Sequence, residues 1–146
     1  CQILGKRMKT RIEWKGDVRF QAESGSGHKV LMEGAPEAGG RDLGPRPMEM
    51  LLMWLGVGTT FDVVMILQKG RQDISDCVVE IEAKRAETDP KVFTHIHLHF
   101  ILTGNDLKHQ QVERAINLSA EKYCSASIML KDAVKITHDF EIVALT

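Results

Sequence analysis

PMEMLLMWLGVGTTFDVVMILQKG, residues 47–70, is a strongly apolar segment bounded by a proline and a glycine. Pro47 suits the first turn of a helix, because an amide in that turn has no partner within the helix, and Gly70 suits the residue after its end. Nearly every face of this helix is apolar, which is typical of a helix that is buried all round. We therefore predict a helix over about 47–69 that is either the central helix of the fold or part of a subunit interface.

Alternating polar and apolar residues predict strands on both sides of this helix. The predicted strands lie within 8–33, 77–84, 92–103 and 135–145, with turns at 15–17, 24–27 and 88–90. Residues 34–46 contain four glycines and two prolines, so they form a loop that is either a binding segment or simply flexible. A second helix is expected over about 109–123, and a short one over 125–131. This pattern predicts an α+β domain with two helices packed on antiparallel sheet.

Composition narrows the class of protein. Of 146 residues, 43% are hydrophobic and 27% are charged, with a net charge of −1, as in a globular chain rather than a disordered one. This balance gives no electrostatic reason to expect nucleic acid or an anionic membrane as a partner. Three cysteines exclude a disulfide-stapled mini-domain. The longest uncharged run, Met50–Phe61, is shorter than the ~20 residues that span a bilayer. We expect an upstream remnant at 1–7 and a single domain over 8–146, located in the cytoplasm.

Two groups of side chains on the predicted strands could bind a metal or react. His95, His97 and His99 would share one face of a strand and could bind a transition metal, or they could face solvent while their neighbours face the core. Alternate residues of a strand are ~6.6 Å apart, so three flat neighbours rarely converge on one ion, and we expect neither a metal nor a cofactor. Cys77 lies on the apolar side of its strand, where a cysteine usually acts as a small hydrophobic residue.

The helices carry a further thiol and two acids. Cys124 lies in a polar segment close to Lys122, which favours a reactive thiolate, although ordinary packing is the alternative. Glu49 falls in the first helical turn, where the helix dipole favours a negative charge. Asp62 is an acid in an apolar helix, so it must be paired, exposed or functional, and an arginine of the loop or strands is one possible partner.

Four motifs together resemble one family. The motifs are GGRD at 39–42, RPMEMLLM at 46–53, FDVVMILQKG at 61–70 and LSAEKYCS at 118–125, and they resemble the OsmC/Ohr family of osmotically inducible and organic hydroperoxide resistance proteins. The resemblance implies an intertwined homodimer with antiparallel sheets packed around two long central helices. It also implies a thiol peroxidase, in which one cysteine of the central helix attacks the peroxide and a second cysteine resolves the sulfenic acid as a disulfide. An external dithiol then reduces that disulfide.

The sequence departs from this family at the position that attacks the peroxide. Cys124 matches the resolving cysteine, but Gly58 occupies the position of the attacking one. Glu49 lies one residue later than the family's acid, and Arg19, Arg41 and Arg46 are the candidates for its activating arginine, of which we favour the first two.

We therefore expect a stress-related, OsmC-like protein whose peroxidase activity is lost or reduced, so that whether it is an enzyme remains open. The alternative is a non-catalytic protein that binds a hydrophobic, lipid-like ligand. A third possibility is chemistry by Cys124 alone.

Overall fold

The computed structural model describes residues 7–145, which fall in two compact units divided between Leu51 and Leu52. Most of the expected remnant at 1–7 lies outside the described residues, and the single domain over 8–146 stays a prediction.

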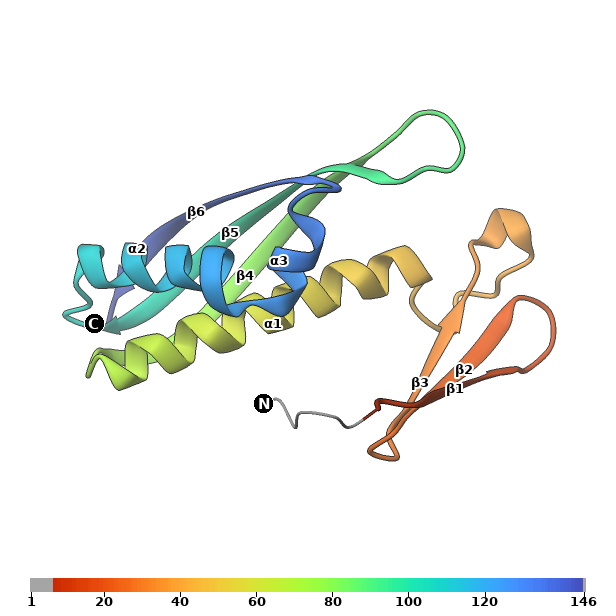
Figure 1. Ribbon diagram of the computed structural model, residues 1–146, viewed down its shortest axis with the longest axis horizontal. Helices are drawn as coiled ribbons and strands as arrows, with labels where there is room; N and C mark the ends of the chain where they lie inside the picture. Colours follow the sequence, from red (N-terminus) through yellow and green to blue (C-terminus); the bar gives the residue numbers. More distant parts are fainter. Residues whose placement is uncertain (1–6, 146) are drawn as a thin grey trace. The chain divides into compact units, whose positions relative to one another are not determined.

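The first unit is an antiparallel meander followed by a loop (Figure 1). Strands β1 (Thr10–Trp14), β2 (Arg19–Ser24) and β3 (Lys29–Glu33) pair in that order, so the strands predicted within 8–33 are confirmed. The loop contains the short 3₁₀ helix η1 (Pro36–Ala38), and Gly39 after it has a φ of 104°, which favours glycine.

A buried carboxylate holds the loop to the end of β3. Glu33 is only 1% exposed, and its two carboxylate oxygens accept the backbone N–H groups of Arg41 at 2.6 Å and Leu43 at 2.7 Å. The hydrogen bond from the Arg41 amide lowers the pKa of Glu33, because it favours the ionised form. These two hydrogen bonds therefore anchor the loop to the end of β3.

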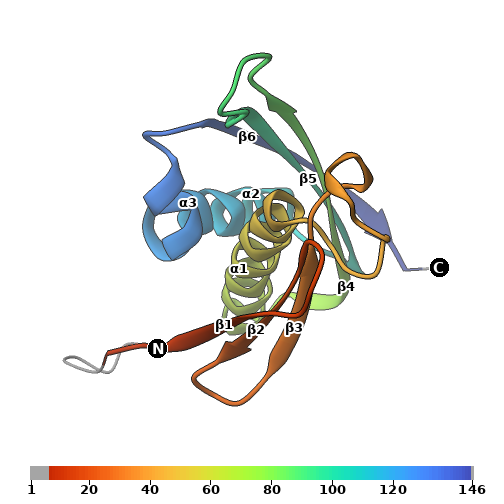
Figure 2. The same cartoon turned by 90° about the vertical axis from the view of Figure 1, so that its right-hand side faces the viewer.

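The second unit contains a sheet with helices on one face (Figures 1 and 2). After α1 (Pro47–Lys69) come β4 (Asp73–Arg85), β5 (Phe93–Asn105), α2 (His109–Leu118), the π-helical turn η2 (Ser119–Tyr123), α3 (Ser125–Leu130) and β6 (Lys135–Ala144). The sheet order is β4-β5-β6. The bounds predicted for α1 are confirmed. The second predicted helix is α-helical only to Leu118 and continues as the π-helical turn η2.

One strand pair corrects the prediction of an all-antiparallel sheet. Strands β4 and β5 are antiparallel, but β5 and β6 are parallel. The helical segment α2–α3 carries the chain from the end of β5 back to its start, which is the crossover that a parallel pair needs. The α+β class is confirmed, with a mixed sheet in this unit.

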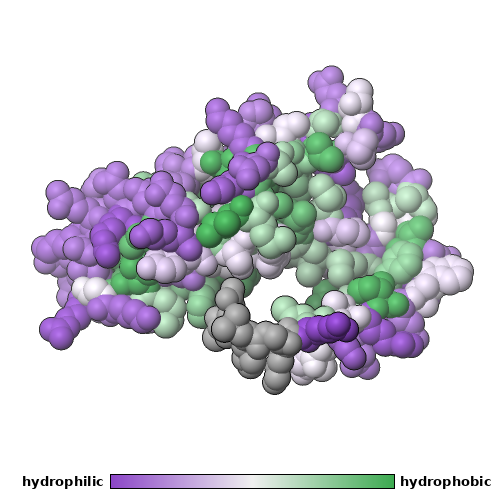
Figure 3. All heavy atoms as spheres, viewed as in Figure 1, coloured by the Kyte–Doolittle hydropathy of each residue, from purple (hydrophilic) through white to green (hydrophobic). Residues whose placement is uncertain are grey.

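The core of this unit lies between the helices and the inner face of β5. Ile96, Leu98, Phe100 and Leu102 alternate inward along β5, and each is at most 2% exposed. The histidines between them point to the opposite face, as expected for a strand with one buried side. Apolar side chains also gather over α1 and α3 on the face shown in Figure 3, whereas α2 is mainly hydrophilic.

Only one side of helix α1 is buried within this chain, and the subunit interface that the sequence left open for the other sides stays a prediction. Its buried residues are Leu55, Gly56, Thr59, Val63 and Leu67, while Val57 is 71% and Phe61 63% exposed. In length and composition α1 is also apolar enough to cross a membrane, with a mean hydropathy of 1.9 over its best window. The core helix of a soluble protein meets the same criterion, so this property does not separate the two settings.

Candidate functional site

Gly58 on α1 faces the thiol of Cys124, which lies 66 residues later at the start of α3. A Cβ atom built on Gly58 would lie 3.5 Å from Cys124 Sγ and 4.0 Å from Ala126 Cβ, both ordinary van der Waals contacts. In a disulfide, each Cβ lies roughly 3 Å from the partner sulfur. The structure thus brings together the two positions that the family resemblance implies for the attacking and resolving cysteines.

The Cys124 thiol is enclosed and hydrogen-bonded. It is 2% exposed, and its Sγ accepts the backbone N–H of Ser127 at 3.5 Å, which caps the start of α3. Thr59 Oγ1 also lies 3.5 Å from Sγ. Because the Thr59 hydroxyl donates its hydrogen to the Leu55 carbonyl at 2.8 Å, the thiol is the donor toward Thr59.

A second glycine of α1 differs from Gly58 in its surroundings. A Cβ on Gly56 would lie 2.7 Å from Ile81 Cδ1 of β4, closer than packed carbon atoms approach. Gly56 therefore allows the helix to lie close to the sheet. Gly58 has room for a side chain, so packing does not explain why the position is a glycine.

Cys77 does not replace the missing thiol. It packs with the half-buried residues around the main core, whereas Cys124 belongs to a separate cluster with Leu55 and Ile96. Both cysteines are free thiols. Burial, with a smaller contribution from Asp76, raises the pKa of Cys77 to about 11, so this side chain stays protonated at neutral pH.

The remaining predicted site residues belong to the first unit. The guanidinium groups of Arg19 and Arg41 both approach Asp17 Oδ2, at 3.8 and 3.4 Å, so this carboxylate brings the two candidate arginines together. Sequence reasoning treated Asp17 only as part of a turn. Glu49 Oε1 accepts the backbone N–H of Arg46 at 2.9 Å, an interaction that stabilises the start of α1.

Asp62 does not contact an arginine. Within residues 7–145 it forms no ion pair, and its Oδ2 lies 3.5 Å from the Ser119 hydroxyl, which also donates to the Thr59 carbonyl at 3.2 Å. Burial raises the pKa of Asp62, and the hydrogen bond from Ser119 opposes that effect. The arginine partner suggested by the sequence was therefore wrong.

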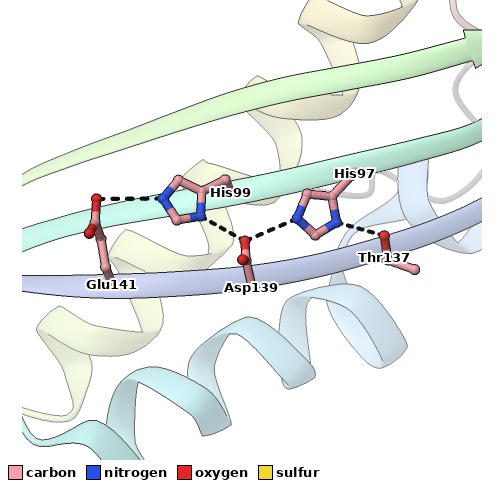
Figure 4. Close-up of polar contacts among 5 residues, drawn as sticks. All are labelled: His97, His99, Thr137, Asp139 and Glu141. Carbon is pink, nitrogen blue, oxygen red and sulfur yellow. Dashed lines mark hydrogen bonds and ion pairs between the residues drawn. The ribbon is translucent and has the colours of Figure 1, made fainter.

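The exposed face of the second sheet carries a row of polar contacts that sequence reasoning missed (Figure 4). Asp139 Oδ1 on β6 lies 3.0 Å from His97 Nε2 and 2.7 Å from His99 Nδ1. The other ring nitrogen of His99 lies 3.5 Å from Glu141 Oε1, and that of His97 lies 2.7 Å from Thr137 Oγ1.

The same row favours a charged histidine over a metal site. With a carboxylate at each ring nitrogen, His99 is best satisfied as a doubly protonated cation, and the hydrogen bond to Asp139 raises its pKa. In the part of the chain that the structure describes, no group of three or more His, Cys, Asp or Glu side chains is arranged to hold a metal ion. Parallel pairing of β5 with β6 creates the row, and the histidine spacing alone could not show it.

Comparisons with known proteins identify the family and the fold of this chain. Residues 39–139 match the family described as OsmC-like protein. Protein YhfA of Escherichia coli K12 is 53% identical over 137 residues, which are 94% of this chain and 99% of that protein. A solved chain from structural genomics is 51% identical, with a TM-score of 0.88 over 94% of this chain and all of its own.

A more distant structure shares the fold alone. The organic hydroperoxide resistance protein OhrB of Bacillus subtilis is 14% identical, with a TM-score of 0.63 over 93% of this chain and 98% of its own. The fold, the pair of positions at Gly58 and Cys124, and these matches define one class of protein. The chain belongs to the OsmC-like family.

Proposed function

We propose that this chain is a stress-related, OsmC-like protein in which the two-cysteine peroxidase cycle of the family is lost or much reduced. The observation that carries the proposal is the room for a side chain at Gly58, 3.5 Å from the Cys124 thiol. The cycle needs two thiols. The first takes the distal oxygen of a hydroperoxide and releases an alcohol, and the second condenses with the sulfenic acid and releases water.

Among the described residues, no group next to Cys124 supplies the missing first step. The Thr59 hydroxyl lies 3.5 Å from Cys124 Sγ, but an alcohol does not cycle through a sulfenic acid. Cys77 has its pKa raised to about 11 and lies in a different cluster. Of the two thiols that the cycle needs, the resolving-type thiol of Cys124 is present, but it has no sulfenic acid with which to condense.

A peroxidase assay tests this proposal. Purified native chain and Gly58→Cys are given cumene hydroperoxide with dihydrolipoamide as the dithiol reductant, and peroxide consumption is followed. We expect little turnover from the native chain and dithiol-dependent turnover from Gly58→Cys. The matched controls are Gly58→Ser, which adds a side chain without sulfur, and Gly58→Cys with Cys124→Ser, which lacks the resolving thiol.

Two results would contradict the proposal in different ways. Turnover by the native chain at the rate of the Gly58→Cys variant would show that the cycle does not need a thiol at position 58. If the native chain is active and that activity is lost in Cys124→Ser, chemistry by Cys124 alone replaces the proposal.

From the family resemblance we propose Arg19 and Arg41 as the candidates for the activating arginine and Glu49 as the candidate acid. Arg19 and Arg41 share Asp17 as a partner, and Arg19 Nε is buried without a hydrogen-bond partner in the described part of the chain. In the Gly58→Cys background we expect Arg19→Gln or Arg41→Gln to lower turnover more than Arg46→Gln does. Equal effects of the three substitutions would remove the assignment. Glu49 is expected to act by fixing the start of α1.

A homodimer is proposed from the uncovered side of α1. Trp54, Val57, Phe61 and Met65 repeat every three or four residues, and each is at least 39% exposed. An apolar stripe of this kind usually marks an interface. Light scattering should give a dimer mass for the native chain and for Gln68→Glu, and a smaller mass for Phe61→Glu. A native chain that is monomeric at micromolar concentration would refute the dimer.

We also propose that the protein works in the cytoplasm, which cell fractionation would test.

Binding of a hydrophobic ligand is the second candidate function. A groove of about 570 Å³ runs between α1 and β4, and its lining is mostly apolar, with Val57, Phe61, Val64 and Met65 on the helix and Val79 on the strand. The size fits a small lipid-like molecule. Native mass spectrometry discriminates this candidate, because a co-purifying apolar mass that is lost in Val64→Trp supports it. Protein that is repeatedly empty argues against it.

A further inference from the structure

A separate cavity lies on the opposite side of α1 from the exposed stripe. It is within the second unit, has a volume of about 280 Å³, and lies between α1, the end of α2, α3 and the inner face of β5 and β6. Its apolar lining includes Leu98 and Phe100 of β5, Ile116 of α2 and Ile136 of β6. A volume of this size is equivalent to roughly nine water molecules, which suits a ligand of about eight non-hydrogen atoms.

One buried hydroxyl in this cavity has no partner. Ser127 is 4% exposed, and its Oγ makes no hydrogen bond in the described part of the chain, although its backbone N–H is used by Cys124 Sγ. Buried polar groups are nearly always paired, so an orphaned hydroxyl needs an explanation. Thr59 lines the same cavity, but its hydroxyl already donates to the Leu55 carbonyl. Of these two hydroxyls, that of Ser127 is the one without a partner among the described residues.

Two opposite charges also line the cavity without pairing. Lys131 follows α3 and Glu121 lies in η2, and neither forms an ion pair with any of the residues 7–145. A carboxylate placed between Lys131 and Ser127 would accept two charge-assisted hydrogen bonds, one from the ammonium group and one from the hydroxyl. The apolar lining would cover the rest of such a molecule.

We propose that this cavity binds a small carboxylic acid with an apolar body, held by Lys131 and the Ser127 hydroxyl. Two sources supply this chemistry, namely a plain short-chain acid and an apolar amino acid. Glu121 would add an interaction only with the second, through the α-ammonium group. The cavity adjoins the Cys124 thiol through Thr59 and Ser127, but the proposal does not rest on a peroxidase cycle.

The test uses sodium 4-methylpentanoate and L-leucine as probes of the full chain, followed by two-dimensional ¹H–¹⁵N NMR. We expect saturable shifts of the Ser127 and Ile136 amides at a Kd of about 1 mM or tighter. Lys131→Met should weaken binding by about tenfold and Ser127→Ala by about fivefold. Lys122→Met is the matched control, because it removes the charge of a nearby lysine that does not line the cavity, and it should leave the affinity unchanged.

Each outcome has a defined meaning. Ser127→Ala removes a hydroxyl that makes no hydrogen bond with any of the residues 7–145, so the variant is expected to fold, and its ¹H–¹⁵N spectrum confirms that before titration. Tighter binding of L-leucine that is lost in Glu121→Gln assigns the site to amino acids, and preference for 4-methylpentanoate assigns it to plain acids. No saturable shift with either probe at 20-fold above that Kd, about 20 mM, overturns the proposal. Equal affinity of the native chain and Lys131→Met overturns it as well.

Discussion

Replacing Gly58 with cysteine should create a disulfide with Cys124 under mild oxidation. The Cβ of the new residue would lie 3.5 Å from Cys124 Sγ, whereas a relaxed disulfide needs roughly 3 Å for that separation. The two segments therefore have to approach by only about half an ångström. Among the described residues, the Cys124 thiol is held by the Ser127 amide and forms no disulfide, so no existing disulfide has to break first.

The expected gain in stability follows from the length of the closed loop. A cross-link between positions 58 and 124 encloses roughly 67 residues, for which the chain-entropy relation gives about 4 kcal/mol of unfolding free energy. Strain from closing the gap reduces this gain, so we expect about 2–4 kcal/mol between the oxidised and reduced forms of the variant. Urea unfolding of both forms measures the difference, and peptide mapping without reduction identifies the linked residues.

A matched cysteine separates this prediction from general thiol reactivity. Val57 is the preceding residue on α1 and is 71% exposed, so the thiol of Val57→Cys faces away from Cys124 and should not pair with it inside one chain. Gly58→Cys combined with Cys124→Ser should show no gain on oxidation. If peptide mapping finds the thiol introduced at position 58 still free, or linked to Cys77, the proximity on which the proposed function rests is wrong.

Three further predictions concern stability. Gly58→Ala should stabilise the fold by about 0.5–1 kcal/mol, because the helix gains propensity without a clash, whereas Gly56→Ala should lose about 1 kcal/mol through overpacking, as measured by urea unfolding. The pKa of Glu33 is lowered in the folded state. Its contribution to the free energy of unfolding is therefore present above the ordinary pKa of 4.5 and is lost as the pH falls through the pKa of the folded state. Thermal unfolding of Glu33→Gln should accordingly change less between pH 6 and pH 3 than that of the native chain. The pKa of His99 is raised in the folded state. Its contribution to the free energy of unfolding is therefore present below the ordinary pKa of 6.5 and is lost as the pH rises through the pKa of the folded state. The native Tm should therefore fall relative to that of His99→Gln between pH 6 and pH 9, and parallel curves would contradict this.

Local signals explain which parts of the fold could be predicted from the sequence. The bounds of α1 follow from Pro47 and Gly70, because both residues act through the backbone within one helical turn. The strands of the first unit follow from alternation of polar and apolar residues, with turns that contain glycine. The approach of Gly58 to Cys124 was different, since it came from the family resemblance and not from any spacing in the sequence.

The features that were missed depend on strand order and on backbone partners. The contact between His99 and Asp139 exists because β6 runs parallel beside β5, and no local pattern encodes which strand lies next to which. Glu33 is an acid at the end of a strand, where exposure is the usual outcome. Its partners are amides eight and ten residues later in an irregular loop, and backbone donors leave no mark in the sequence of side chains.

Helix α1 is apolar on nearly every side, yet only one of its faces is buried within the chain. Without a polar face, hydrophobicity cannot select the side that packs on the sheet of the same unit. On the buried face, a Cβ atom at Gly56 would lie 2.7 Å from Ile81 Cδ1, and the Thr59 hydroxyl lies 3.5 Å from Cys124 Sγ. Val57 and Phe61 are left uncovered by their own chain. Burying these two side chains requires an additional surface, so the single-chain packing itself supports a second copy or an apolar ligand at the exposed stripe.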